Sequence, residues 1–152
     1  MYIKIPESKD ISECAKVYVS AYSAEPWEEV YEEAEVENYI CAYLDSDTKC
    51  CFAAVEQEQI VGVVLGLIVP YVGSQFFRIE DFCISPKVQR KGCGTTFMEL
   101  IEKEAAKRGC DSILLGTQRE FPSHRFYLKN GFQEIESVLL FKEIEEMAHE
   151  KI

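Results

Sequence analysis

The chain has 152 residues, of which 47% are hydrophobic, and a formal net charge of −11 from 27 acidic and 16 basic side chains. This length and apolar content predict one folded domain over residues 1–152 and argue against disorder. The negative charge argues against nucleic-acid binding, and is compatible either with attraction of a cationic substrate or with solubility alone. No apolar run approaches the roughly 20 residues of a membrane-spanning helix, so no membrane partner is expected.

The cysteines and histidines give no metal-binding pattern. Seven cysteines are scattered without a C-x-x-C pair, and only two histidines accompany them. Free thiols in a reducing compartment and no metal site are therefore expected. The first residues, Met1-Tyr2-Ile3-Lys4, lack the charged and apolar regions of a signal peptide, which predicts a cytoplasmic location.

Hydrophobic periodicity divides the chain into short strands and amphipathic helices. We predict, in chain order, a strand at 2–5, helices at about 11–22 and 28–44, strands at 51–55, 60–69 and 76–85, a helix at 94–108, a strand at 112–115, a helix at 123–130, and two final strands at 132–136 and 138–142 before a charged tail. Asp10 and Glu13 form a capping-box pattern at the start of the first helix. The order β-α-α-β-β-β-α-β-α-β-β predicts an α/β fold, a mixed sheet with helices on both faces. The strands that flank the helix at 94–108 should be parallel, because a crossover of this length joins parallel neighbours.

The segment SPKVQRKGCGTT, residues 85–96, combines basic side chains and glycines between a strand and a helix. A helix start exposes unpaired amides and partial positive charge, which suit a phosphate. Gly92 and Gly94 let the backbone turn towards such a ligand, and Arg90 and Lys91 add charge. The P-loop pattern is absent, and the dinucleotide fingerprint lacks its third glycine. A phosphate or pyrophosphate site is predicted; an ordinary turn with basic surface residues is the plainer alternative.

Two motifs resemble one known family. Gln89-Arg90-Lys91-Gly92-Cys93-Gly94 resembles the Q/R-x-x-G-x-G/A signature of the GCN5-related N-acetyltransferase (GNAT) superfamily, and Phe126–Phe132, FYLKNGF, resembles its LYxKxGF segment. The order of elements over essentially the whole chain agrees too. The resemblance implies the GNAT-like acyl-CoA N-acyltransferase fold and acetyl-CoA as cosubstrate. The cofactor-binding residues it implies are Phe82, Cys83, Ile84, Gln89, Arg90, Lys91, Gly92, Cys93, Gly94 and Thr95.

Within that family, main-chain amides of the glycine loop hold the pyrophosphate, and the pantetheine arm adds to the strand edge at residues 82–84. One of those strand amides would polarise the thioester carbonyl. The chain departs from the family pattern at Glu120, where many members have asparagine, and at Ser123, where alanine is common. Glu120 cannot donate an amide hydrogen bond to the cofactor.

Acetyl transfer to an amine needs a proton acceptor for the amine and a proton donor for the leaving thiolate. Glu80 and Asp81 are adjacent acids in an apolar strand, in a segment that resembles diamine and polyamine acetyltransferases; aminoglycoside-type members carry an acid at the Asp81 position. Strand alternation places Glu80 with Phe82 and Ile84, and Asp81 on the opposite face. Either acid could relay the proton, or both are ordinary paired carboxylates.

Tyr127 is the predicted proton donor, because the equivalent tyrosine of the family lies beside the thiolate. The simpler interpretation is an aromatic side chain on the buried face of the last helix.

Trp27 and Tyr31 lie among many glutamates and are predicted to bind a cationic amine. We therefore expect an N-acetyltransferase acting on a small cationic molecule, such as a polyamine or an aminoglycoside-like compound. A peptide or protein N-acetyltransferase is one alternative, and a non-catalytic acetyl-CoA-binding domain is another. The resemblance also implies a homodimer, because an exposed edge strand near 133–142 could pair two subunits, as often happens in this superfamily.

Overall fold

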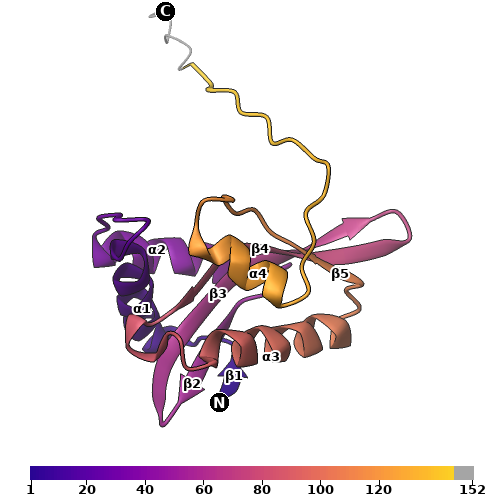
Figure 1. The fold of residues 1–152 in the computed structure, drawn as a ribbon. Coiled ribbons are helices and arrows are strands. Elements are labelled where there is room, and N and C mark those ends of the chain that lie inside the picture. The colour runs from indigo at the N-terminus through magenta and orange to yellow at the C-terminus, as the bar shows by residue number, and fades with distance from the viewer. Residues whose placement is uncertain (146–152) are drawn as a thin grey trace, which may run out of the picture.

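A mixed sheet of strand order β1-β2-β3-β4-β5 forms the centre of the fold in the computed structural model, which describes residues 1–145 (Figure 1). The elements are β1 (Tyr2–Lys4), η1 (Ser8–Asp10), α1 (Ile11–Ser23), α2 (Glu33–Leu44), β2 (Phe52–Glu56), β3 (Gln59–Tyr71), β4 (Ser74–Ile84), η2 (Pro86–Val88), α3 (Cys93–Lys107), β5 (Ser112–Leu114) and α4 (Pro122–Lys129). Strands β1 to β4 are antiparallel neighbours, and β5 pairs parallel with β4 across the α3 crossover. The predicted mixed sheet and its parallel pair are confirmed.

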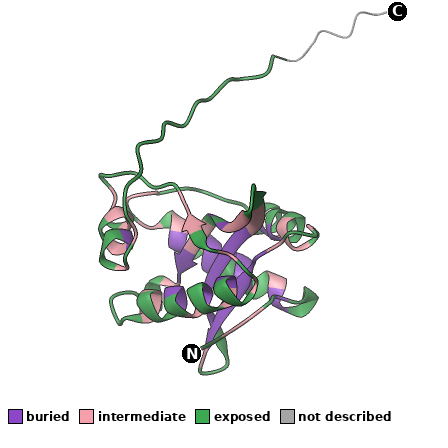
Figure 2. Ribbon diagram, turned by 90° about the vertical axis from the view of Figure 1, so that its right-hand side faces the viewer, coloured by how far each residue is buried: buried purple, intermediate pink, exposed green. Residues whose placement is uncertain are grey.

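Helices cover both faces of this sheet, as the sequence predicts. Helices α1 and α2 pack over one core cluster, whose fully buried members include Ile40 and Leu65. Helices α3 and α4 cover the other face over a second cluster, with Phe77 and Phe97 at its centre. Figure 2 shows the buried residues gathered in the central strands, with the outer helix surfaces exposed. No helix in residues 1–145 is long and apolar enough to cross a membrane.

A β-bulge interrupts the pairing of β3 with β4 next to the two acidic residues. Leu65 pairs with Asp81 whereas Gly66 pairs with Ile79, so Glu80 is an extra residue on β4. A Cβ at residue 66 would lie 2.2 Å from a main-chain oxygen of the facing strand, so only glycine fits opposite the bulge. Bulges bend a strand and redirect its side chains, and they are common beside active sites.

The bulge changes which side chains share a face of β4. Phe77, before it, and Ile84, after it, belong to the same core cluster although seven positions separate them. Cys83 belongs to the opposite cluster, and Asp81 points to that same side, towards α1 and α2. The strict alternation predicted for this strand is therefore correct for Asp81 and Cys83 but does not continue through Glu80, which is exposed.

The C-terminal segment differs from the prediction. Residues 133–145 form no strand and extend away from the body of the molecule (Figure 1). The apolar side chains of Val138, Leu139, Leu140 and Phe141 are 80–93% exposed. A strand is stabilised by ladder hydrogen bonds and by burial of one face, and this segment has neither within the described chain. The two final strands predicted at 132–136 and 138–142 are therefore wrong for the single chain, and the rest of the charged tail lies outside the described residues.

Candidate active site

A cleft of about 870 Å³ opens where β4 and β5 diverge. The two strands pair only from Phe76 to Arg78 on β4, so beyond Arg78 the β5-facing edge of β4 has no strand beside it among residues 1–145. Residues Phe82 to Ile84 on this free edge line the cleft. Unpaired N–H and C=O groups on a strand edge can bind an extended ligand that itself carries amides.

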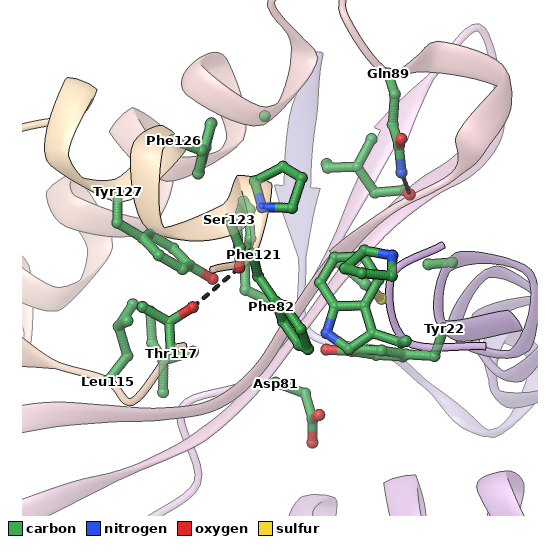
Figure 3. A pocket seen from close by; sticks show the side chains of 18 of the residues that line it. Tyr22, Asp81, Phe82, Gln89, Leu115, Thr117, Phe121, Ser123, Phe126 and Tyr127 are labelled. Carbon is green, nitrogen blue, oxygen red and sulfur yellow. Dashed lines mark hydrogen bonds between the residues drawn. The ribbon is translucent and has the colours of Figure 1, made fainter. Parts of the chain in front are cut away.

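Most of the site residues predicted from the sequence line this cleft, and Figure 3 labels four of them, Asp81, Phe82, Gln89 and Tyr127. The full set is Trp27, Glu80, Asp81, Phe82, Cys83, Ile84, Gln89, Arg90, Gly92, Gly94, Thr95 and Tyr127.

Three predicted residues, Lys91, Cys93 and Tyr31, are not part of the cleft lining. The Cys93 thiol lies 3.4 Å from a carboxylate oxygen of Glu56. The Tyr31 ring packs 5.8 Å from that of Tyr18.

The glycine loop ends in a helix start whose amides are free to bind an anion. Gly92 caps α3 in the left-handed conformation, with φ 80°. The Thr96 amide donates the first intrahelical hydrogen bond, to Gly92 at 3.1 Å, so the three amides before it precede the helical ladder. Gly94 lies against the Phe126 ring, which a Cβ would approach to 3.0 Å. The Gln89 side chain donates to the Ile84 carbonyl at 3.0 Å and closes the turn after β4.

Of the two adjacent acids, Asp81 is the one held in place by other side chains. Its carboxylate accepts a hydrogen bond from the Tyr18 hydroxyl at 3.2 Å on one oxygen and one from the Tyr39 hydroxyl on the other. Glu80 also lines the cleft, but it is exposed and its carboxylate lies 3.9 Å from the guanidinium of Arg78. Exposed ion pairs of this kind contribute little free energy. Asp81 is therefore the better-oriented proton acceptor.

Tyr127 is buried on α4, with its ring between three other aromatic side chains. The ring centroids of Phe126 and Phe132 are each 5.4 Å away, and that of Phe82 is 6.3 Å away. Burial, with smaller contributions from Cys83 and Asp81, raises the pKa of Tyr127 well above its ordinary value. The phenol therefore keeps its proton at neutral pH and can act as a hydrogen-bond donor in the cleft.

An aromatic wall closes the cleft on the side of α1. The Trp27 ring lies 5.6 Å from that of Tyr22 and 5.7 Å from that of Phe121, both edge-on. Glu25 lines the cleft beside them. Aromatic faces and carboxylates in one cavity attract cations.

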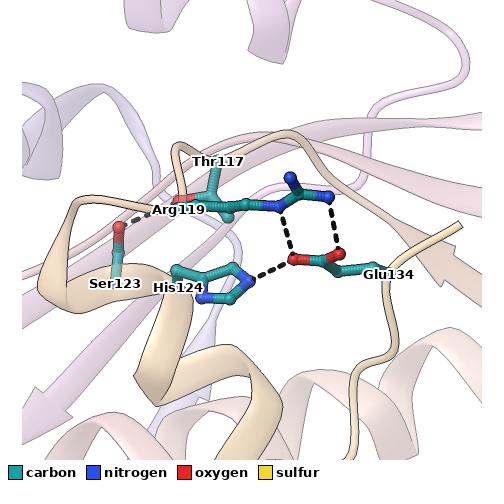
Figure 4. A network of polar contacts seen from close by, with 5 residues as sticks. All are labelled: Thr117, Arg119, Ser123, His124 and Glu134. Carbon is teal, nitrogen blue, oxygen red and sulfur yellow. Dashed lines mark hydrogen bonds and ion pairs between the residues drawn. The ribbon is translucent and has the colours of Figure 1, made fainter. Parts of the chain in front are cut away.

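The loop between β5 and α4 forms another wall, and polar contacts hold it in place (Figure 4). The Thr117 and Ser123 hydroxyls are hydrogen-bonded at 2.9 Å. Glu134 accepts two hydrogen bonds from Arg119, at 3.0 and 2.9 Å, and contacts His124 at 2.8 Å. Arg119, followed by His124, lowers the pKa of Glu134. These contacts fasten the loop to the segment that follows α4.

Several residues of the site could not be identified from sequence. Tyr18 and Tyr39 are hydrogen-bonded to Asp81, from which they are separated by 63 and 42 positions in the sequence. No local sequence pattern predicts contacts over such separations. Lys129 lines the cleft from the end of α4 and adds a second cation to Arg90. Among residues 1–145, no three His, Cys, Asp or Glu side chains are grouped to hold a metal ion.

Several solved structures have a fold similar to that of the chain. The apo aminoglycoside antibiotic 6′-N-acetyltransferase AAC(6′)-IG from Acinetobacter haemolyticus has 21% identity and a TM-score of 0.75, over 95% of this chain and 100% of its own. AAC(6′)-Iy, in complex with the bisubstrate analogue CoA-S-monomethyl-acetylneamine, has 16% identity and a TM-score of 0.74, over 93% of this chain and 97% of its own. A GNAT family acetyltransferase from Staphylococcus aureus subsp. aureus USA300_TCH1516 has 15% identity and a TM-score of 0.74, over 94% and 100%. At these identities the likeness establishes the fold.

Sequence comparison establishes the family. No curated protein matches the chain. The model of the acetyltransferase (GNAT) family matches residues 14–132, which is more than half of the chain and includes both the glycine loop and Tyr127. The chain therefore belongs to the acetyltransferase (GNAT) family.

Proposed function

We propose that the protein is an acetyl-CoA-dependent N-acetyltransferase that acts on a primary amine of a small cationic molecule. One observation carries this proposal: a fixed carboxylate, Asp81, and a buried phenol, Tyr127, line the same cleft as the free edge of β4. A domain that only binds acetyl-CoA needs the strand edge and the helix start, and has no use for an acceptor and a donor of protons beside them.

The chemical groups that line the cleft suit the diphosphate and the amides of acetyl-CoA. The amides of Gly94 and Thr95, which line the cleft, would hold the diphosphate at the start of α3, with Arg90 and Lys129 supplying positive charge. The free edge of β4 would pair with the amides of the pantetheine arm. When bound, the thioester supplies an activated acetyl group.

Asp81 would remove the proton that blocks the amine. An alkylammonium has a pKa of about 10, so freeing its lone pair at neutral pH costs about 4 kcal/mol. Asp81 would take this proton directly or through one water, after which the amine nitrogen forms a bond to the acetyl carbon and the carbon–sulfur bond breaks. Tyr127 would donate a hydrogen bond to the sulfur as it gains negative charge.

Transfer through an acetylated cysteine is not supported by the site. Cys83 is among the residues that line the cleft, but its side chain belongs to the buried cluster under α1 and α2. Burial, followed by the charge of Asp81, raises the pKa of its thiol well above the ordinary value. A thiol in that state is a poor nucleophile, and His124, the one histidine within residues 1–145, is not part of the cleft lining. Direct transfer to the amine is therefore proposed.

The acceptor wall supports a cationic small molecule. Tyr22, Trp27 and Phe121 present aromatic rings, and Glu25, Glu80 and Asp81 present carboxylates. One solved structure of similar fold is named an aminoglycoside antibiotic 6′-N-acetyltransferase, which supports the same class of acceptor. A peptide or protein amine is the second candidate, and the exposed acidic side chains around residues 28–37 would favour a basic peptide.

Replacing Tyr127 with phenylalanine is expected to lower the rate of acetyl transfer about 30-fold, because one hydrogen bond to a charged atom is lost. Thiol release from acetyl-CoA should be followed over a panel of polyamines, aminoglycosides and basic peptides. Since burial raises the pKa of Tyr127 above 10, the ratio of wild-type to variant rates should stay constant from pH 7 to pH 10.

The acetyl-CoA dissociation constant of the same variant provides the control, and it should change little because the hydroxyl is removed without altering the ring. Tight acetyl-CoA binding by the wild type without turnover of any amine would favour the non-catalytic binding domain. Turnover of peptides but of no small amine would support the second candidate, a peptide or protein amine, as the acceptor.

We also propose that the segment 138–144 binds a second copy of the chain. It exposes Leu140, Phe141 and Ile144 almost fully, while β5 has a free edge in the described part of the sheet. The extended apolar segment of one copy can pair with the unpaired strand edge of the other copy.

The double substitution Leu140→Glu and Phe141→Glu should raise the dimer dissociation constant at least 10-fold, because charges would enter an apolar interface. Light scattering coupled to size exclusion measures this. Val30→Glu is the matched control, because Val30 is 94% exposed outside this segment. It should leave the molar mass of the particle in solution unchanged. A wild-type protein that stays monomeric at about 100 μM would contradict the proposal.

A further inference from the structure

The carboxylate of Asp81 is held by phenols from two different helices. Tyr18 lies on α1 and donates to Oδ1, whereas Tyr39 lies on α2 and donates to Oδ2. The carboxylate of Asp81 accepts one hydrogen bond on each oxygen, and both hydroxyls are the donors. Two donors, one on each oxygen, fix the rotation of the carboxylate about its own axis.

The two phenols are themselves held by neighbouring rings. Tyr18 is buried, and its ring lies 4.6 Å from that of Tyr22 and 6.0 Å from that of Tyr39. Tyr39 lies edge-on to Tyr43 at 5.3 Å. Burial, followed by the charge or hydrogen bond of Asp81, raises the pKa of both phenols well above the ordinary value. Both therefore stay protonated and remain donors at neutral pH.

A carboxylate has about four lone-pair positions, and the phenols use two of them. The remaining positions can accept the proton of an amine in the cleft, because Asp81 is part of the cleft lining. The bulge at Glu80 points Asp81 towards α1 and α2, and the phenols then hold it there. A base whose orientation is set in advance transfers a proton without first losing rotational freedom.

We infer that Tyr18 and Tyr39 are positioning residues, which hold the Asp81 carboxylate in the orientation that accepts the proton of the amine. This inference rests on the proposed function, and it assigns a part in catalysis to α1, which forms one wall of the cleft, and to α2, which does not line it. Neither tyrosine needs to contact the substrate to act in this way.

A double-mutant cycle tests the inference. Tyr39→Phe should lower kcat about 10-fold, since one hydrogen bond to the carboxylate is lost, and should leave the KM for acetyl-CoA unchanged. In the Asp81→Asn background the same substitution should change kcat less than about twofold, because the residue through which it acts is already gone. Equal losses in both backgrounds would overturn the inference.

Tyr43→Phe is the matched control, because Tyr43 lies one turn further along α2 and packs against Tyr39 without bonding to Asp81 in the described structure. It should leave kcat within about twofold of the wild type. Tyr39 is 36% exposed, so its substitution should also leave the unfolding temperature nearly unchanged. A tenfold loss for Tyr43→Phe would assign the effect to helix packing.

A measurement that needs no substrate separates this inference from the proposed function. The free energy of unfolding should be measured for Tyr18→Phe, for Asp81→Ala and for the double variant. Because Tyr18 donates to Asp81, the double variant should lose less stability than the sum of the two single losses. If no amine is acetylated but this coupling is seen, the proposed function fails while the contact to Asp81 stands; strictly additive losses would contradict the contact itself.

Discussion

Asp81→Asn is expected to lower kcat/KM for acetyl transfer by about 10³-fold, since a general base contributes roughly 10² to 10⁴. Asparagine keeps the size of the side chain and an oxygen that can accept from Tyr18, but it cannot take a proton from an ammonium group. The loss should appear in steady-state thiol release with the best amine of the panel, whereas the acetyl-CoA dissociation constant should stay within about threefold because no charge is removed near the glycine loop.

Glu80→Gln is the matched variant for this prediction. Both substitutions remove one negative charge from adjacent residues, so they reduce the attraction of a cationic acceptor to the same extent. Glu80 is exposed and contacts only Arg78 at 3.9 Å among the described ion pairs, so its loss should cost less than about fivefold. Similar losses in the two variants would mean that these carboxylates attract the amine without transferring its proton, and a larger loss for Glu80→Gln would make Glu80 the base.

Features that depend on neighbouring residues were predictable from the sequence. The glycine loop is one example, because two glycines and the basic residues beside them suffice to describe a strand-to-helix turn, and the structure has Gly92 at φ 80° there. The parallel pairing of β4 with β5 is another, since a helix between two strands restricts their connection. Tyr127 lines the cleft, and its role as proton donor stays a prediction.

A local pattern misleads where a distant residue competes for the same atoms. Asp10 and Glu13 match a capping box, yet the Asp10 carboxylate accepts from Lys4 and from the amide of Glu7, and makes no capping bond to α1. Glu13 instead accepts from the amide of Ile60. The helix begins where predicted, but without the hydrogen bonds of a capping box.

Contacts between distant parts of the chain account for the other differences. The bulge at Glu80 depends on the close approach of Gly66 to the facing strand, which strand alternation alone cannot show. The apolar segment 138–141 has the composition of a strand, but a strand also needs a pairing partner, and none is found for it within residues 1–145. Tyr18 and Tyr39 look like core aromatics until the fold places Asp81 between them.

Gly92→Val is expected to raise the KM for acetyl-CoA by about 10²-fold. Gly92 has φ 80°, a conformation that a β-branched residue avoids, so valine should turn the peptide that leads into α3. The amides of Gly94 and Thr95 would then point away from the diphosphate, and roughly two charge-assisted hydrogen bonds would be lost. Calorimetry with acetyl-CoA and with coenzyme A should show the same loss, because the acetyl group lies at the other end of the ligand.

Gly73→Val is the control that separates ligand binding from backbone strain. Gly73 has φ 76° in the turn between β3 and β4, and like Gly92 it has no atom within 4 Å of where a Cβ would lie. The two substitutions should therefore lower the free energy of unfolding by similar amounts, about 1–3 kcal/mol each. Gly73 does not line the cleft, so its variant should bind acetyl-CoA like the wild type. Equal losses of acetyl-CoA affinity in the two variants would show that instability causes the effect, and the diphosphate would then have to bind elsewhere than at the start of α3.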